Sequence, residues 1–458
     1  MTKHRLSIPD NCINGKQIKD CIETEGSLDD NALQETCNDI AKFGGKNINK
    51  LVAQNDKLLV FPKELDYYED GIGQQQICSL STEPYTLYTG NVIGYVGSGN
   101  TLMHIGSRFD HDKKEYFLHY MLQKVFCPHL VDFQYTSTSE PIFDLLLYLF
   151  PYFLKKAMTQ GLYKEYKNFE WNDGKVKGTI DVVNHINKNV PFRGNIAYRT
   201  REYSYDNKIT QLIRHTIEHI KHSPLGRGVL QDVEVVKHIR LIQNSTPTYS
   251  LWNRRKVLLD NSKLIKHPYF TNYTILQQLC IRILRYEELK FGDDSDKVYG
   301  VLFDGAWLWE EYLNTLLQKV GFTHPRNRAV SNTHKQSVYL FDGNLYERFP
   351  DFYVAGKMVI DAKYKSLGSV IGREDMHQII SYLHVLSVPN ASFAYPGKCG
   401  PTEYNTIGKL KGMGGEIGRF AIGIPQKCDT YKDFSAKMIC QEGAFADEIG
   451  RLLNKSSL

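Results

Sequence analysis

One short stretch near the C-terminal end constrains the fold and the chemistry of this chain more than any other. It reads Arg348-Phe-Pro-Asp351-Phe-Tyr-Val-Ala-Gly356-Lys-Met-Val-Ile-Asp361-Ala-Lys363. Residues 348–354 and 358–364 are rich in β-branched and aromatic side chains, and Gly356 lies between them. Two such segments separated by a short glycine-containing loop are typical of a β-hairpin.

The spacing of the stretch also predicts which residues face each other. A three-residue loop pairs Val354 with Met358 and places Asp351 directly opposite Asp361, with Cβ atoms about 5 Å apart. Lys363 shares their face because side chains alternate along a strand. The other face is expected to be the buried one, since it collects apolar side chains: Pro350, Phe352, Val354, Met358, Ile360 and Ala362.

Two carboxylates and a lysine on one face suit a particular kind of chemistry. Mg²⁺ takes oxygen ligands and is usually held by one or two carboxylates together with water and substrate phosphate. Such a metal activates water and neutralises charge on a phosphate, and a nearby ammonium group stabilises the same charge. The alternative is a surface hairpin on which Asp361 and Lys363 are simply solvated.

The flanking segments predict helices on both sides of this hairpin. Residues 303–320 show apolar side chains at helical spacing and also carry Glu310 and Glu311. Residues 373–386 show a second apolar helical face, and Gln378 and Tyr382 are four residues apart on a different face. With a strand expected at 392–395, the order is α-β-β-α-β.

This order resembles the core of the PD-(D/E)xK nuclease superfamily, and Gln378-Ile-Ile-Ser-Tyr382 resembles the Gln-x-x-x-Tyr element of its RecB-like branch. Further similarity is to McrC, the nuclease subunit of modification-dependent (type IV) restriction systems. It is carried by Leu308-Trp309-Glu310-Glu311-Tyr312, by Gly174-Lys-Val-Lys-Gly178-Thr-Ile-Asp181 and by Tyr88-Thr-Gly-Asn91-Val-Ile-Gly94. The first 60 or so residues match nothing in that family.

The resemblance implies roles for individual residues. Asp351, Asp361 and Lys363 would be catalytic, with Glu310 as the acid of the first helix. Mg²⁺, which Mn²⁺ can replace, would be held by Asp351, Asp361 and Glu310. Glu311 is an equally available acid. Gln378 and Tyr382 would be accessory residues, although Gln378 can equally be an exposed helix residue and Tyr382 a core residue: these alternatives stay open.

The charge of the chain is modest, at +5 over 458 residues. The whole molecule is therefore not a strong polyanion binder, and local basic clusters matter more. Double-stranded DNA is the expected substrate, with Arg326, Arg328 and Lys365 as weak candidates for phosphate contacts. The basic run at 254–256 is better explained as a solvated face.

The expected location is cytoplasmic, without membrane association. Nine scattered cysteines with no C-x-x-C pair and no signal peptide favour a reducing compartment. The longest apolar run, residues 145–154, is too short to span a bilayer. No G-x-x-x-x-G-K-[ST] stretch occurs, so the chain is not expected to bind a nucleotide itself.

The predicted architecture is α+β and multidomain. Residues 1–110 form a β-rich N-terminal domain, in which 94–99 is a hairpin and not a nucleotide loop. Residues 111–297 are mainly helical, with helices at 114–126 and 142–167 and a β segment near 175–196. Residues 298–458 form the nuclease domain, a central mixed sheet flanked by helices, and the acidic loop 293–297 marks its boundary.

Three functional hypotheses follow. The favoured one is a metal-dependent endonuclease subunit in an anti-phage restriction complex. By resemblance, a McrB-like AAA+ GTPase ring would drive it, and residues 1–110 would dock on that ring and stimulate it. The second is a self-sufficient, site-specific endonuclease. The third is a non-enzymatic activator of the motor with vestigial acids.

Overall fold

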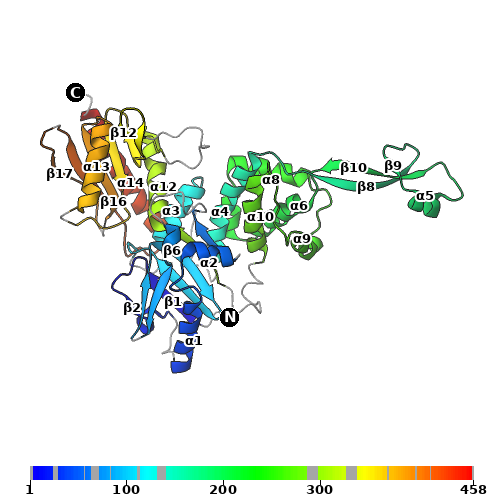
Figure 1. Ribbon diagram of the computed structural model, residues 1–458, viewed down its shortest axis with the longest axis horizontal. Coiled ribbons are helices and arrows are strands. Elements are labelled where there is room, and N and C mark those ends of the chain that lie inside the picture. The colour runs from blue at the N-terminus through cyan, green and yellow to red at the C-terminus, as the bar shows by residue number, and fades with distance from the viewer. Residues whose placement is uncertain are drawn as a thin grey trace. The chain divides into compact units, whose positions relative to one another are not determined.

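The computed structural model describes residues 4–23, 29–55, 57–62, 72–82, 84–110, 114–130, 141–285, 298–325, 338–368, 371–397, 400–412 and 414–455 (Figure 1). The chain groups into two compact units. The first joins Met1–Leu145 with Lys290–Leu458, and the second is Leu146–Leu289. This grouping cuts across the three consecutive blocks expected from the sequence, because a strand from the third block completes a sheet of the first.

That sheet is the N-terminal sheet, with strand order β1-β7-β6-β11-β3. Strands β6 and β7 form the hairpin predicted at 94–99, and β11 lies between β6 and β3 although about 200 residues of chain separate it from β6. The bounds are β1 (His4–Pro9), β3 (Leu58–Phe61), β6 (Val92–Ser98), β7 (Thr101–Gly106) and β11 (Tyr299–Asp304).

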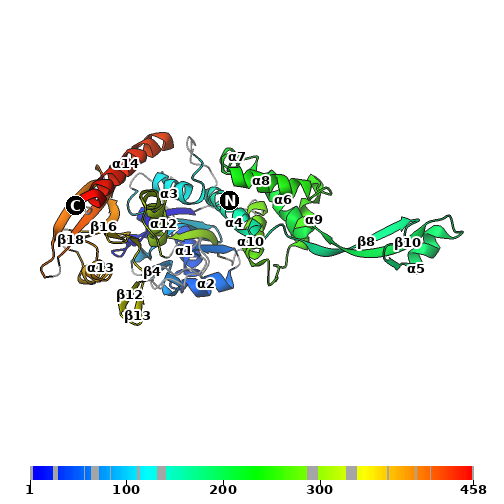
Figure 2. The same ribbon diagram turned by 90° about the horizontal axis from the view of Figure 1, so that it is seen from above.

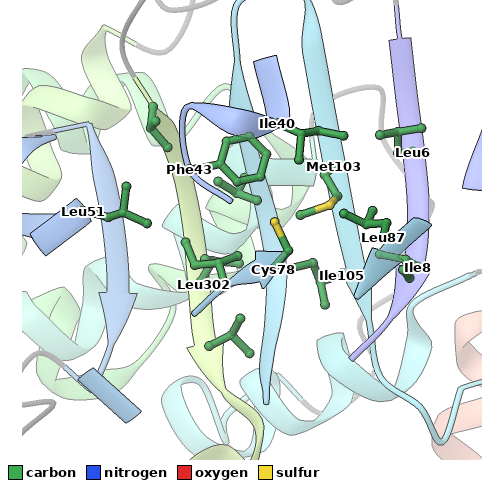
Figure 3. Close-up of a cluster of buried hydrophobic side chains, with 14 of the residues drawn as sticks. Leu6, Ile8, Ile40, Phe43, Leu51, Cys78, Leu87, Met103, Ile105 and Leu302 are labelled. Carbon is green, nitrogen blue, oxygen red and sulfur yellow. The ribbon is translucent and has the colours of Figure 1, made fainter. Parts of the chain in front are cut away.

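One face of the N-terminal sheet carries a hydrophobic core (Figure 3). Leu302 of β11 and Met103 of β7 meet Ile40 and Phe43 from α1 and the turn after it. Cys78 and Leu87 come from a second, three-stranded sheet of order β2-β5-β4. The elements are β2 (Lys16–Gln17), α1 (Asp30–Ala41), α2 (Ile48–Gln54), β4 (Cys78–Thr82) and β5 (Tyr85–Thr89).

The C-terminal part of the first unit contains a second five-stranded sheet, called here the C-terminal sheet, of order β14-β15-β16-β18-β17. Strands β15, β16 and β18 are parallel, whereas β14 and β17 are antiparallel edges, so the sheet is mixed as expected. The strands are β14 (Phe352–Val354), β15 (Met358–Ala362), β16 (Asn390–Gly397), β17 (Glu403–Lys409) and β18 (Glu416–Gly423).

Helices α12 (Gly305–Leu317), α13 (Arg373–Val385) and α14 (Tyr431–Lys455) pack on this sheet, and α3 (Tyr116–Phe126) packs against α12 and α14. The α12, β14, β15, α13, β16 order matches the predicted α-β-β-α-β order. One part of the prediction was wrong. Arg348 does not belong to the first hairpin arm but ends β13 (Leu345–Arg348), which pairs with β12 (Val338–Phe341) in a separate hairpin.

The second unit consists of helices and a long β-hairpin. The chain enters it along α4 (Pro141–Met158), and β8 (Glu165–Asp173) pairs with β10 (Ile196–Ser204) over its whole length. Figure 1 shows these strands extending beyond the helices, with β9 (Thr179–Ile180) and α5 (Val182–Asn189) at the far end. The helices are α6 (Lys208–Ile220), α7 (Pro224–Val229), α8 (Val233–Asn244), α9 (Arg254–Asp260) and α10 (Thr271–Leu284).

Two predictions for this unit need correction. The helix expected at 142–167 ends at Met158, because Gly161 adopts a left-handed conformation (φ 82°) and its amide bonds to the Met158 carbonyl. The β segment expected near 175–196 contains helix α5, whose first turn is capped by the side chain of Asp181. Figure 2, turned by 90°, also shows α5 at the end of the hairpin of β8 and β10. Among the described residues, no helix is long and apolar enough to cross a membrane.

Candidate active site

The two acids are positioned by the hairpin of β14 and β15. Val354 pairs with Met358 across a three-residue turn, which confirms the predicted register. Gly356 takes a φ of 68° in that turn, a backbone conformation that glycine adopts without steric cost. The ladder ends at the pair Phe352 and Ile360. Asp351 directly precedes β14, and its Oδ2 accepts a 2.7 Å hydrogen bond from the amide of Ala362, the residue after Asp361.

Asp361 is completely buried, so the alternative of a simply solvated Asp361 was wrong, and so was the expectation that only the opposite face belongs to the core. Strand β15 lies between β14 and β16, and both of its faces are covered. Ile360 is buried on one face, and Val359, on the face of Asp361, packs against Ile379 and Leu383 of α13. The sequence of β15 alternates correctly, but a strand inside a sheet flanked by helices has no solvent face.

Burial dominates the electrostatics of Asp361. It raises the pKa of the carboxyl group to about 7, and the charge of Asp351 acts in the same direction. Lys363 opposes this effect, with its Nζ 2.8 Å from Asp361 Oδ2. Burial lowers the pKa of Lys363, but the charges of Asp361 and Asp351 outweigh it, so that pKa is raised and the ammonium form is held.

Helix α13 supplies the remaining neighbours of Lys363. Its Nζ lies 3.1 Å from Gln378 Oε1 and 3.6 Å from Asp375 Oδ1. The amide of Gln378 donates to the Tyr382 hydroxyl at 3.1 Å, and that hydroxyl donates to the Phe349 carbonyl at 3.3 Å. Gln378 thus touches the lysine directly, whereas Tyr382 is buried and reaches it only through Gln378.

The two acids of α12 have different surroundings. Glu310 Oε1 lies 3.5 Å from Nε2 of His324, whose Nδ1 lies 2.7 Å from the backbone carbonyl of Asp351. A carbonyl oxygen only accepts, so Nδ1 carries the proton. Glu311 instead accepts a hydrogen bond from Trp307 one turn earlier on its own helix. The structure therefore connects Glu310 to the hairpin through His324.

Two residues of this site were missed from the sequence. His324 is buried, stacks on Phe352 and is brought there because Thr323 pairs with Tyr353. No local pattern predicts such a pairing across 30 residues. Asp375 was within reach of sequence reasoning, since it lies in the first turn of a predicted helix, three residues before Gln378.

Of the three weak candidates for DNA contacts, the structure describes only Lys365. Arg326 and Arg328 lie outside the described residues. Lys365 keeps an exposed ammonium group but pairs with Asp375 Oδ2 at 2.6 Å. Asp375 thus sits between Lys363 and Lys365 and contacts both.

The buried oxygens of Asp361 suit a divalent cation, but few protein ligands among the described residues are close enough together to hold one. Both carboxylate oxygens of Asp361 are buried without a well-aligned hydrogen bond, which is costly for a carboxylate and suits a cation. In the part of the chain that is described, no three His, Cys, Asp or Glu side chains gather into a metal site by themselves. Asp351 and Asp361 fit as the one or two carboxylates that usually hold Mg²⁺, and Glu310 is connected to them through His324.

Comparisons with known proteins find one matching family and similar solved structures. A family model described as "McrBC 5-methylcytosine restriction system component" matches residues 87–396, more than half of the sequence. Curated protein sequences give no match. Among solved structures, a chain of the refined half-complex from the tetradecameric assembly of Thermococcus gammatolerans McrB AAA+ hexamers with bound McrC is similar. It is 14% identical, with a TM-score of 0.48 over 95% of this chain and 99% of that one.

A chain from the cryo-EM structure of the Thermococcus gammatolerans McrBC complex is also similar. It is 13% identical, with a TM-score of 0.34, and the match covers 69% of this chain and 87% of that one.

Proposed function

The chain belongs to the McrBC 5-methylcytosine restriction system component family, and on that premise we propose that it is the endonuclease subunit of a restriction complex. It hydrolyses DNA phosphodiester bonds with Mg²⁺ and works with a McrB-like AAA+ GTPase ring. Its proposed location is the cytoplasm, because a restriction complex acts on foreign DNA there. The C-terminal sheet with its flanking helices is then a PD-(D/E)xK core.

One observation carries this proposal: the Asp351 carboxylate is hydrogen-bonded to the amide that follows Asp361 and acts on the charge of Asp361, and the ammonium group of Lys363 lies 2.8 Å from Asp361 Oδ2. These two carboxylates would hold Mg²⁺, which when bound supplies charge neutralisation and water activation at the phosphate. Glu310 supports the site from α12 through His324.

The chain's own residues have separable tasks. Burial of Asp361 excludes water, which strengthens electrostatic interactions at that carboxylate. Lys363, held charged, donates hydrogen bonds to the phosphate oxygens or to the attacking water. Gln378 and Asp375 restrain the lysine from α13, so a flexible four-carbon side chain presents its ammonium group in one place.

The ring motor is proposed as a separate protein, because the sequence has no phosphate-binding loop of its own. Residues 1–110 remain one candidate for the docking surface. A specific observation favours a second candidate, which is the far end of the β8–β10 hairpin. There, apolar side chains of α5 and the segment after it are largely exposed: Val182, Val183, Ile186, Val190 and Phe192. Clustered exposed apolar side chains of this kind mark protein contacts.

The proposal is tested with the chain purified together with its partner ring. Methylated and unmethylated DNA are incubated with GTP and Mg²⁺, using wild-type chain and Asp361→Asn. Cleavage by the wild-type complex, and none by the complex that contains Asp361→Asn, supports the proposal. Equal cleavage by the variant would overturn the assignment of this site, and cleavage without the ring or GTP would favour the self-sufficient endonuclease.

A further inference from the structure

We propose that the N-terminal sheet is part of the nuclease machinery, with Arg108 and Tyr364 as positioning residues for Lys363. The inference rests on the proposed function and adds to it a way for the first third of the chain to control cleavage. Tyr364 directly follows the lysine, and Arg108 lies just beyond the end of β7. The contact joins residues about 250 positions apart.

The ring of Tyr364 is clamped by three consecutive residues of the N-terminal part. Its hydroxyl lies 2.7 Å from Ser107 Oγ, and both residues are buried. The guanidinium carbon of Arg108 lies 5.0 Å from the centre of the ring, and Phe109 meets it edge to face at 5.1 Å. Hydrogen bonding, cation–π contact and aromatic packing therefore act on one side chain.

The clamp is itself rigidly held. Arg108 Nη2 lies 2.8 Å from Asp10 Oδ2 and 3.0 Å from Asn91 Oδ1, and the Arg108 amide donates to Asp10 Oδ1 at 2.6 Å. Asp10 is buried at the end of β1. Asp10 and Asn91 both contact Nη2 and hold the guanidinium group, while the bond from Asp10 to the amide holds the backbone that carries it, so the group faces Tyr364.

The same ring also touches the helix that carries Glu310. Gly305 opens α12, and a Cβ at that position would lie 2.6 Å from Tyr364 Cε1, so only glycine lets the ring approach. Its predecessor Asp304 ends β11 in the N-terminal sheet and caps α12 with its side chain, at 2.9 Å from the Ala306 amide. The sheet, the helix start and the tyrosine thus form one packed unit.

The clamp confines Lys363 from its C-terminal side. The amide of Lys363 donates to the Ala394 carbonyl of β16 at 2.9 Å, and the next residue is the clamped tyrosine. With the backbone fixed on both sides, the ammonium group stays within reach of Asp361. A tyrosine that only filled the core would be needed for stability but would not affect the reactivity of Lys363.

The direct test is the rate at which an amine-acylating reagent labels Lys363, measured by mass spectrometry on the full chain. Lys365 is the internal reference, because its side chain is 50% exposed whereas that of Lys363 is 17% exposed. Tyr364→Phe keeps the ring and removes the hydroxyl. We expect Lys363 labelling to rise about threefold or more, the scale of one net hydrogen bond, with Lys365 unchanged.

Two further variants make this result specific. Ser107→Ala removes the same hydrogen bond from the other side, together with the one that the Phe109 amide donates to Ser107 Oγ. It should therefore raise labelling at least as much as Tyr364→Phe, and the double variant should add nothing to it. Tyr404→Phe is the matched control, because Tyr404 lies in the edge strand β17, three strands away from β15 in the C-terminal sheet. Unchanged Lys363 labelling in Tyr364→Phe and Ser107→Ala, with unfolding midpoints near wild type, would overturn the proposal.

The activity arm uses the complex with the partner ring. Tyr364→Phe should lower the single-turnover cleavage rate about tenfold, equivalent to one displaced hydrogen-bonding group, while the half-saturating Mg²⁺ concentration stays the same. A loss of Mg²⁺ affinity would instead point to the carboxylates and contradict the positioning of Lys363. The labelling arm needs no DNA, metal or partner, so it is decided even if the chain proves not to be a nuclease.

Discussion

Asp351 and Ala362 are joined by a 2.7 Å hydrogen bond from the Ala362 amide to the Asp351 carboxylate. The bond ties the first acid to the strand of the second, one residue beyond Asp361. A carboxylate oriented by a backbone amide loses little freedom when a cation binds. Asp351, which directly precedes the three-residue edge strand β14, is therefore held at a fixed place.

Asp361→Asn should abolish metal-dependent cleavage, with a loss on the order of 10³-fold, the scale of losing a group that stabilises developing charge. The unfolding midpoint should not fall, because the variant removes a charge that burial disfavours. Asp361→Ala is the contrasting variant, since it leaves a cavity inside β15 and should lower the midpoint as well. Cleavage assays and thermal unfolding of both variants check this.

Two substitutions of His324 each remove one of the two contacts of its imidazole ring. His324→Asn keeps a donor near the position of Nδ1 but loses the contact with Glu310. His324→Gln reaches the position of Nε2 but loses the hydrogen bond to the backbone carbonyl of Asp351. If both contacts matter, each variant should weaken Mn²⁺ binding about 10- to 100-fold, as losses of supporting partners do. Calorimetric titration with Mn²⁺ gives the affinities. Wild-type affinity in both variants would mean that His324 only fills space beside Phe352.

The docking candidates are separated by charged substitutions on exposed side chains. Val183→Glu with Phe192→Glu should abolish co-purification with the ring, because charges oppose burial of the hairpin end, where these side chains are 70% and 65% exposed. Val233→Glu is a matched control on α8, 74% exposed. If the ring is retained in the hairpin variant but lost with Ile13→Glu, the N-terminal block makes the contact.

A buried carboxyl group outside the site predicts a pH effect on stability. Burial raises the pKa of Glu115 to about 8, and Tyr95, His104 and His119 contact it. Above its unfolded pKa the folded state binds the extra proton, so this contribution to stability is lost as pH rises towards and through 8. The pKa values of the two histidines are lowered to about 4 and about 3 by burial, so they affect stability only below about pH 6.5.

Between pH 6.5 and 8.5 the wild-type unfolding midpoint should therefore fall, and Glu115→Gln should flatten that decline. The other charges acting on Glu115 are Glu23, Asp110 and Arg5, which the substitution leaves in place. A decline of equal steepness in the variant would assign the pH effect to another group.

What the sequence could predict depended on how far apart the interacting residues are. The hairpin register follows from a three-residue loop and alternation within 17 residues, so Asp351, Asp361 and Lys363 could be grouped in advance. The burial of Asp361 could not, because it depends on β16 and α13, which lie further along the chain. His324 was missed for the same reason, since only its neighbour's pairing with Tyr353 brings it in.

The organisation of the chain shows the same limit. Residues 299–304 were placed in the nuclease block because the acidic loop 293–297 was taken as its boundary, yet they form β11, whose partners are β6 and β3. Deleting residues 1–110, an obvious way to test motor docking, would therefore strip β11 of both neighbours. Exposed strand edges promote aggregation, so that truncation would report on folding before it reported on docking.

The chain leaves the first unit at Leu145 and returns to it at Lys290. This is the connectivity of a domain inserted into another domain, which proteins tolerate when an insert folds around its own core. The helices and hairpin of Leu146–Leu289 can then change in length or sequence without shifting the register of any strand that carries an acid. Selection for a new partner and selection for cleavage need not compete for the same residues.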